Sequence, residues 1–354
     1  MNFSQIADPA PRADDGAAET FVQYVCEDGT VEIRRSSPAE PYEITLLPTR
    51  SDLYVPRKTC RTNFSRELIH ALMERTDFAW LCDTIARHED NSSVPGVLKH
   101  QLFSYATPED FAGKRLLDFG CGNGASSMTI GRLLPQTEVI GVELGVDKVE
   151  LADRIRAYRQ LENVRFLSSP SGSELPPGIG QFDFVMLSAV YEHLLPAERK
   201  IVMPLLWSSM KAGALIFINQ TPYRYFPLEA HSSGLWFINY LPDRLAHAVV
   251  RRLARGNETI NKSPDWNVHL RGGLRGGTEG EILENLTGGN RKCAQIMQPR
   301  KNGVRDRADF WLSNTTPNRH RMVKQGIASA FRLTDALWGT IPSMNLEVVI
   351  RKVC

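Results

Sequence analysis

The sequence lacks the features that mark several specialised classes of protein. Its 354 residues contain no apolar run that approaches the ~20 residues of a membrane-spanning helix. The net charge of +2 gives no general attraction to nucleic acid. No two of the six cysteines have the C-x-x-C spacing of a zinc or redox site. We therefore expect a cytoplasmic protein whose cysteines are reduced thiols.

The sequence also gives little sign of a metal ion or of RNA as a partner. No set of Asp and Asn residues has an obvious metal-binding spacing, so we expect no bound metal. Residues 271–277 contain two Arg-Gly-Gly repeats, which resemble the tracts of RNA-binding proteins. Two copies are too few for such a tract, and a flexible loop is the preferred interpretation. We expect no nucleic-acid partner.

The chain is longer than one minimal domain requires. Residues 1–19 are rich in Ala, Asp and Pro and lack an apolar core, which predicts a disordered tail. Residues 20–110 form an N-terminal extension. It contains a small β-hairpin, marked by Asp28-Gly29, a candidate third strand over 42–47, and apolar residues at helical spacing over 65–87.

From residue 111 to residue 354, the pattern is that of one α/β domain. Short apolar strands over 115–119, 138–143, 164–167, 182–188 and 214–219 alternate with helical segments, which predicts right-handed βαβ units. Residues 293–298 and 346–353 form two closing strands. We expect a Rossmann-like, seven-stranded, mostly parallel sheet with helices on both faces, and an insertion at 221–277 after the fifth strand.

A glycine loop follows the first of these strands. Gly120, Gly122 and Gly124 allow a tight turn and a close approach of ligand to backbone. With Ala125 they also match the G-x-G-x-x-A pattern of dinucleotide sites, so an NAD-dependent oxidoreductase is a rival interpretation. Asp118 at the strand end argues against it, because a carboxylate there repels a pyrophosphate but holds the ammonium of an amino acid, directly or through water. Glu143 ends the second strand, where it can accept both hydroxyls of a ribose.

Four segments, in this order, resemble the motifs of the class I S-adenosylmethionine-dependent methyltransferases: residues 116–124, 141–143, 182–194 and 210–215. The resemblance covers about residues 111–219 and implies S-adenosyl-L-methionine as cofactor and S-adenosyl-L-homocysteine as product. Ser171 stands where the family often has an Asp that accepts from the adenine amine. The implied cofactor-binding residues are Asp118, Phe119, Gly120, Cys121, Gly122, Gly124, Glu143, Leu144, Ser171, Gly172 and Ser188.

Methyl transfer to a hydroxyl requires a group that removes the hydroxyl proton, and histidine suits that task. The candidates for catalysis are His231 in the insertion and the pair Glu192 and His193 after the fourth strand. The alternative for His193 is a scaffold role, since many members of the family carry a Glu-His pair there. The alternative for His231 is a side chain whose hydrogen bonds lie within its own loop.

The preferred function is O-methylation of a small-molecule, sugar or lipid-linked acceptor. The N-terminal extension would serve as a lid or as part of the acceptor pocket, and the basic segment 241–255 would allow peripheral contact with a membrane.

A nucleic-acid base is disfavoured as the acceptor, because Ser188-Ala189-Val190-Tyr191 replaces the Asn-Pro-Pro-Tyr motif of nucleic-acid N-methyltransferases. The alternatives are a C- or N-methyltransferase of a small metabolite and a non-catalytic cofactor-binding protein. The sequence leaves the oligomeric state open.

Overall fold

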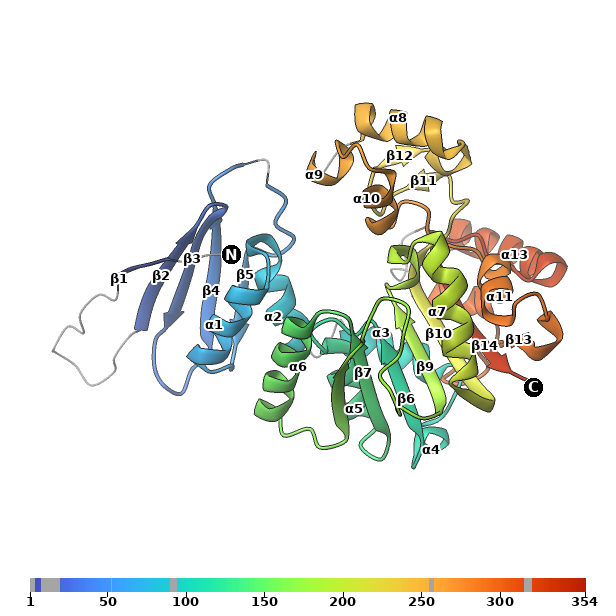
Figure 1. Cartoon of the computed structure of the whole chain (residues 1–354), viewed down its shortest axis with the longest axis horizontal. Coiled ribbons are helices and arrows are strands. Elements are labelled where there is room, and N and C mark those ends of the chain that lie inside the picture. Colours follow the sequence, from blue (N-terminus) through green and yellow to red (C-terminus); the bar gives the residue numbers. More distant parts are fainter. Residues whose placement is uncertain (1–3, 8–19, 52, 90–93, 255–257, 315–319) are drawn as a thin grey trace.

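The computed structural model describes residues 4–7, 20–51, 53–89, 94–254, 258–314 and 320–354. Its centre is a seven-stranded sheet with the order β13-β14-β10-β9-β6-β7-β8 (Figure 1). The strands from β6 to β10 are parallel, and β14 lies antiparallel between β10 and β13. The bounds are β6 Arg115–Phe119, β7 Glu138–Glu143, β8 Val164–Ser168, β9 Phe182–Ser188, β10 Met210–Pro222, β13 Ala294–Ile296 and β14 Asn345–Lys352. The predicted seven-stranded, mostly parallel sheet is confirmed.

Helices cover both faces of this sheet, which explains why its strands read as nearly continuous apolar runs. On one face, Leu117 and Val185 belong to a core shared with α7 and α11. On the other, Leu116 and Met186 belong to a core shared with α3, α5 and α6. These helices are α3 Val94–Phe103, α5 Ala125–Leu133, α6 Val146–Tyr158, α7 Pro196–Ser208 and α11 Glu279–Thr287, and the short α4 is Pro108–Phe111.

The strand order creates the place where a ligand binds. From β6 the chain proceeds to β7 and β8 on one side, then crosses to β9 on the other side of β6. The loops that leave β6 and β9 therefore diverge at the carboxyl edge of the sheet. Such a switch point opens a crevice in doubly wound folds.

The N-terminal extension holds more sheet than the sequence predicted. The expected hairpin, β2 and β3, is part of a five-stranded antiparallel sheet in the order β1 to β5. An isolated hairpin is marginal in water, and here Val31 and Ile44 pack against α1 and α2. β1 lies within the expected disordered tail, which corrects that prediction for four residues. The rest of the tail lies outside the described residues. The bounds are β1 Ser4–Ala7, β2 Thr20–Cys26, β3 Gly29–Arg35, β4 Tyr42–Pro48, β5 Thr59–Thr62, α1 Arg66–Arg75, η1 Phe78–Trp80 and α2 Leu81–Glu89.

The insertion after β10 folds as a small helical layer beside the carboxyl edge of the sheet (Figure 1). Ile238, Val250 and Leu274 form its own apolar core. The predicted flexible loop at 271–277 is wrong, because Arg275 is buried and donates to the Leu241 carbonyl at 2.9 Å. Its elements are β11 Leu228–Glu229, β12 Leu235–Trp236, η3 Ile238–Tyr240, α8 Asp243–Leu253, α9 Glu258–Asn261 and α10 Trp266–Arg271. Within the described part of the chain, no helix is long and apolar enough to cross a bilayer.

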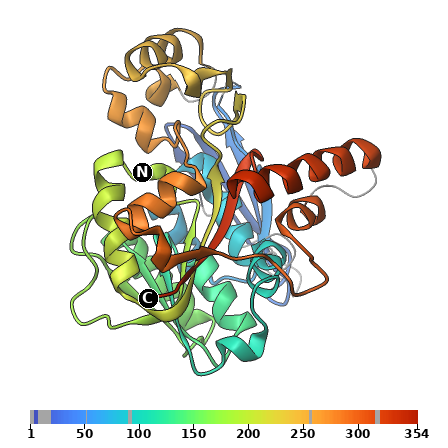
Figure 2. The ribbon, with the colours of Figure 1, turned by 90° about the vertical axis from the view of Figure 1, so that its right-hand side faces the viewer.

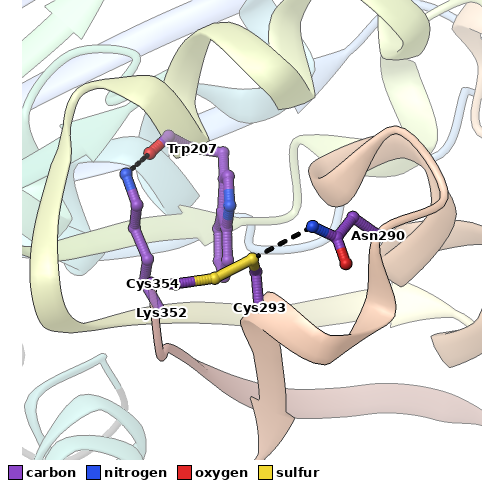
Figure 3. The surroundings of a disulfide bond; sticks show 5 residues. All are labelled: Trp207, Asn290, Cys293, Lys352 and Cys354. Atoms are coloured by element: carbon purple, nitrogen blue, oxygen red, sulfur yellow. Dashed lines mark hydrogen bonds between the residues drawn. A yellow bond between two sulfur atoms is a disulfide. The ribbon is translucent and has the colours of Figure 1, made fainter.

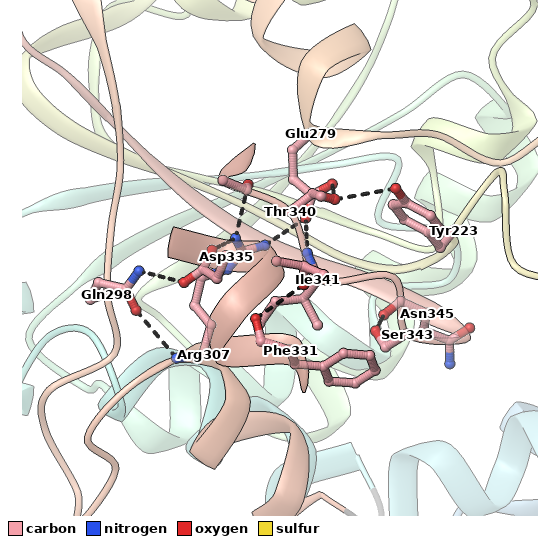
Figure 4. Close-up of polar contacts among 12 residues, drawn as sticks. Tyr223, Glu279, Gln298, Arg307, Phe331, Asp335, Thr340, Ile341, Ser343 and Asn345 are labelled. Atoms are coloured by element: carbon pink, nitrogen blue, oxygen red, sulfur yellow. Dashed lines mark hydrogen bonds and ion pairs between the residues drawn. The ribbon is translucent and has the colours of Figure 1, made fainter. Parts of the chain in front are cut away.

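A buried arginine joins the C-terminal helices α11, α12 (Arg307–Ser313) and α13 (Arg321–Trp338) (Figure 4). Arg307 donates to Glu279 at 2.7 Å and to Asp335 at 2.6 Å. Glu279 also accepts from Thr340 at 2.7 Å, and the Thr340 hydroxyl lies 3.2 Å from that of Tyr223. The network therefore connects these helices to the first turn of the insertion. Figure 2 shows α13 projecting from the body of the molecule.

A disulfide ties the C-terminus to the edge strand (Figure 3). Cys293 and Cys354 are bonded, with their Cα atoms 5.0 Å apart. The pairing of β13 with β14 brings them together, since Ala294 lies opposite Lys352. The expectation of six reduced thiols is thus wrong for this pair. The other four cysteines are free: Cys26, Cys60, Cys82 and Cys121.

Replacing Arg307 with Met should lower the free energy of unfolding by about 3–5 kcal/mol, because Glu279 would keep a buried charge without its partner. The matched control is Arg305→Met, which removes an exposed arginine just before α12 that pairs with Asp309 in that helix. That change should cost at most about 1 kcal/mol. Urea denaturation followed by circular dichroism measures both. Equal losses in the two variants would contradict the assigned role of Arg307.

Replacing Cys354 with Ser should lower the free energy of unfolding by about 2–4 kcal/mol, because the cross-link restricts the unfolded chain. Dithiothreitol should lower the wild-type stability by a similar amount and leave the variant unchanged. Cys26→Ser, at a free thiol, is the control. A wild-type denaturation midpoint that does not respond to the reductant would show that the disulfide does not contribute.

Candidate active site

A cavity of about 400 Å³ opens at the carboxyl ends of β6, β7 and β9. Eight of the residues singled out from the sequence line it: Phe119, Gly120, Gly122, Glu143, Leu144, Ser171, Gly172 and His193. They come from four separate loops, which the parallel strands bring to one edge. The glycine loop, the second-strand carboxylate and one candidate base thus share a single cavity.

The glycine loop is shaped by left-handed backbone angles. Gly120 and Gly122 have φ values of +73° and +56°, which side chains other than glycine rarely adopt. A Cβ on Gly120 would come within 2.7 Å of Val190, whereas one on Gly122 would meet no atom within 4 Å. The backbone at Gly122 therefore borders open space, where a ligand can approach it closely.

Glu143 is held in place by that loop. One of its carboxylate oxygens accepts from the backbone N–H of Gly122 at 3.0 Å. The other lies 3.6 Å from the ammonium of Lys148, which also lines the cavity. This arrangement fixes a charged acceptor at the end of β7, as the recognition of two ribose hydroxyls requires.

Asp118 lies beneath the loop rather than in the cavity lining. Its carboxylate is buried and accepts from the hydroxyls of Ser126 and Ser127, each at 2.6 Å. Burial raises the pKa of Asp118, and the two serine hydrogen bonds oppose that rise. The contacts tie the end of β6 to the start of α5. That the Asp118 carboxylate binds the ammonium group of the cofactor, directly or through water, stays a prediction.

Three other predicted cofactor residues are absent from the lining: Cys121, Gly124 and Ser188. Cys121 is buried, and a Cβ on Gly141 would approach its sulfur to 2.9 Å. It fills space between β6 and β7, and burial raises the pKa of its thiol well above the ordinary value. Gly124 has a φ of +84° and caps the N-terminus of α5. Cys121 and Gly124 therefore shape the glycine loop without lining the cavity.

The three candidate catalytic residues meet beside the cavity. One ligating atom of each of Glu192, His193 and His231 lies within 4.8 Å of those of the other two. The Glu192 Oε1 and His193 Nε2 atoms are 3.9 Å apart, and the two histidine ring centroids are 5.6 Å apart. Of the three residues, His193 alone lines the cavity wall.

Glu192 is the buried member of this group, with 0% of its surface exposed. Its Oε2 atom accepts from the Thr221 hydroxyl at 2.9 Å, whereas Oε1 has no hydrogen-bond partner. Burial raises the pKa of Glu192, and the neighbouring charges of His193 and His231 act in the opposite direction. The carboxylate is therefore an acceptor with one unused oxygen.

The His193 ring has one defined tautomer. Its Nδ1 atom lies 2.6 Å from the carbonyl oxygen of Arg271, at the end of α10. A carbonyl can only accept, so Nδ1 carries a proton and the neutral ring presents Nε2 as an acceptor. Nε2 is the atom that faces Glu192.

A buried carboxylate positions the turn that carries His231. Glu229 accepts from the backbone N–H groups of His231 at 2.9 Å and Ser233 at 2.6 Å. The structure therefore assigns Glu229 to the turn itself. Arg224, which belongs to the same insertion, lies 3.7 Å from Glu281.

The glycines at 272–277 allow close packing against this cluster. Gly273 has a φ of +86°, and a Cβ there would lie 2.5 Å from the His231 ring and 3.3 Å from Glu192. The sequence contained this signal, because conspicuous glycines mark close approaches as well as flexible loops. The sequence did not show which residues they approach.

Sequence reasoning missed several cavity residues: Val142, Lys148, Ser169, Ala189, Val190, Leu194 and Arg271. Four of them lie within the recognised motifs, Val142 in 141–143 and the other three in 182–194, and were within reach of the same argument. Arg271 lies 78 positions from His193, so only the folded insertion reveals their contact. Within the described part of the chain, no residue of the N-terminal extension lines this cavity. A role for the extension as a lid or acceptor pocket therefore stays a prediction.

Comparisons with known proteins agree with the motifs. Residues 117–216 match the family model of a methyltransferase domain. The chain is 30% identical over 158 residues to a ubiquinone biosynthesis O-methyltransferase of Brucella anthropi, covering 44% of this chain and 56% of the relative. It is 23% identical over 112 residues to an uncharacterised protein of Rickettsia prowazekii, covering 32% of this chain and 44% of the relative. The chain thus spans about half the length of these curated relatives.

Among solved structures, PKMT2 of Rickettsia typhi aligns over 73% of this chain and 52% of its own, with 12% identity and a TM-score of 0.42.

The residues present fit S-adenosylmethionine. The open backbone at Gly122 offers room for the ligand beside β6, and Glu143 offers a charged acceptor for its ribose. Ser171 lines the cavity, and its hydroxyl donates to Glu174 at 2.8 Å. That hydroxyl is thus engaged within its own loop.

Replacing Glu143 with Ala should weaken S-adenosylmethionine binding by about 10- to 100-fold, because hydrogen bonds to a charged group contribute about 1.5–3 kcal/mol. Isothermal titration calorimetry measures the change. Glu138→Ala is the matched control, since Glu138 begins the same strand at the opposite edge of the sheet. Unchanged affinity in Glu143→Ala, or an equal loss in the control, would contradict this assignment.

Proposed function

We propose that this chain, a member of the class I S-adenosylmethionine-dependent methyltransferases, methylates a hydroxyl group of a small-molecule, sugar or lipid-linked acceptor. One observation carries the proposal. A buried carboxylate and two histidines meet beside the cavity that the glycine loop lines, and one of them, His193, belongs to the cavity wall. Such a cluster suits the removal of a proton from an alcohol or phenol.

The cofactor supplies a methyl group that its positive sulfur already activates. The chain then has to align the acceptor and remove its proton. In the proposed reaction, His193 Nε2 takes the hydroxyl proton while the acceptor oxygen forms its bond to the methyl carbon. The Arg271 carbonyl keeps the His193 ring in the required tautomer. The Glu192 carboxylate, 3.9 Å away, stabilises the imidazolium that results.

Two findings support an oxygen acceptor and a lipid-linked substrate. A relative from Brucella anthropi and one from Acinetobacter baylyi carry the name ubiquinone biosynthesis O-methyltransferase. The insertion also exposes apolar side chains, among them Trp236 and Phe237, and it exposes the basic side chains of Arg251 and Arg252 on α8. Apolar and basic groups on one surface favour peripheral contact with an anionic membrane. This part of the proposal concerns α8, which matches the predicted basic segment up to Leu253.

A carbon or nitrogen acceptor is the alternative on the same domain, because a stabilised enolate or an amine needs less from a base. The cluster of Glu192, His193 and His231 favours oxygen. A non-catalytic protein would bind the cofactor but release no S-adenosylhomocysteine with any acceptor.

Replacing His193 with Ala should lower turnover on hydroxyl acceptors by about 10²- to 10⁴-fold, the usual contribution of a general base. Affinity for S-adenosylmethionine should change much less. Release of S-adenosylhomocysteine from a panel of phenols, sugars and prenylated phenols measures the turnover. His70→Ala, at an exposed histidine of α1, is the control. Full turnover in both His193→Ala and His231→Ala would rule out a base-dependent hydroxyl mechanism.

A further inference from the structure

We infer that Glu192, His193 and His231 bind a divalent metal ion of the zinc class. An open coordination position on this ion would hold the acceptor hydroxyl. The inference rests on the proposed function for the identity of the acceptor, and it replaces the step in which His193 removes the acceptor proton. The ion site itself rests on the three side chains and their surroundings.

The ligand set is the first argument. Two imidazoles and one carboxylate, with a fourth position left open, form one of the usual kinds of catalytic zinc site. Bonds of about 2.0–2.2 Å in a tetrahedral site place the ligand atoms about 3.4 Å apart. Here the three atoms already lie within 4.8 Å of one another, and Glu192 Oε1 and His193 Nε2 are 3.9 Å apart. Small side-chain rotations close the remaining distance.

The unpaired oxygen of Glu192 is the second and independent argument. The side chain is fully buried, and Thr221 fixes its Oε2 atom. Oε1 accepts no hydrogen bond and is the atom that points to the cluster. A buried carboxylate oxygen without a partner costs free energy. A cation between Oε1 and the histidines would remove that cost.

The third argument is the orientation of His193. Metal-bound histidines almost always donate their other ring N–H to a carbonyl or carboxylate, which fixes the tautomer. The hydrogen bond from Nδ1 to the Arg271 carbonyl has this form and leaves the Nε2 lone pair free to bind an ion. The nearby guanidinium of Arg271 is paired with Glu198, so its charge is compensated. With neutral histidines, the cluster carries one negative charge and attracts a dication.

The burial of the three residues indicates where the open position lies. Glu192 forms the floor, and His231 is exposed. His193 lines the wall of the donor cavity. An acceptor oxygen on the ion would therefore lie between solvent and the methyl donor.

A bound divalent ion lowers the pKa of a coordinated hydroxyl. The acceptor oxygen loses its proton to water and forms a bond to the methyl carbon. The bond from that carbon to sulfur breaks, and its electron pair stays on sulfur. The ion changes neither charge nor oxidation state. In this arrangement, the histidines act as ligands rather than as the proton acceptor.

The test uses the full chain, stripped of metal with a chelator and titrated with Zn²⁺ by calorimetry and with Co²⁺ by visible absorption. The wild type should bind one ion, with the Co²⁺ spectrum of a tetrahedral site. His231→Ala should lower Zn²⁺ affinity by about 100-fold or more, since loss of even an outer hydrogen bond costs 10- to 100-fold. His70→Ala removes a surface histidine that lies 3.3 Å from Glu74 and should leave the affinity unchanged.

Wild-type protein that binds neither ion would overturn the inference, as would equal affinity in wild type and His231→Ala. Because Glu192 is buried, Glu192→Gln is used only with a thermal unfolding curve that matches the wild type. S-adenosylmethionine binding is measured on the same samples. If metal-free protein still binds S-adenosylmethionine and still methylates the acceptor, the ion site is wrong and the proposed function stands. If the protein binds the metal ion but not S-adenosylmethionine, the proposed function is wrong and the ion site stands.

Discussion

The burial of the Glu192 carboxylate is the constraint on which the acceptor side of this protein depends. A charge without access to water needs its compensation from the protein around it. Thr221 supplies one hydrogen bond from the end of β10, and His193 and His231 supply the polar groups that face the other oxygen. The η2 turn (Tyr191–His193), the end of β10 and the insertion thus converge on one carboxylate. The insertion has to be folded against the sheet before this half of the site exists.

The donor side could be read from the sequence because its determinants are local. Strands buried on both faces leave continuous apolar runs, so the bounds of β6, β7 and β9 agree with the predicted ones. The glycine loop and Glu143 follow those strands directly, and the parallel arrangement brings the strand ends together. Even there, the sequence could not separate residues that line the cavity from those that support it. Asp118 and Cys121 lie behind the loop because burial depends on helix α5, which no short motif specifies.

The rest of the structure depends on contacts that are distant in sequence. The disulfide follows from the register of β13 and β14, which lie about fifty residues apart along the chain. The five-stranded sheet of the extension arises because β1 and β5, each four residues long and not recognised from the sequence, pair with β2 and β4. The meeting of Glu192 with His231 depends on the turn that Glu229 holds. In each case, local sequence patterns specify the individual strands and turns. Burial of an apolar face or of a charge then determines which of them pack together.

Gly273 shows which substitutions near this site would abolish activity without removing a reactive group. It has no side chain, yet the space where its Cβ would lie is occupied by the His231 ring. A saturation mutagenesis screen for loss of activity would therefore rank Gly273 beside the histidines, although it has no side chain that could take part in a reaction. The same crowding limits how the insertion can diverge among relatives. Its outer helices are free to change, whereas the backbone that crosses the cluster has to remain bare.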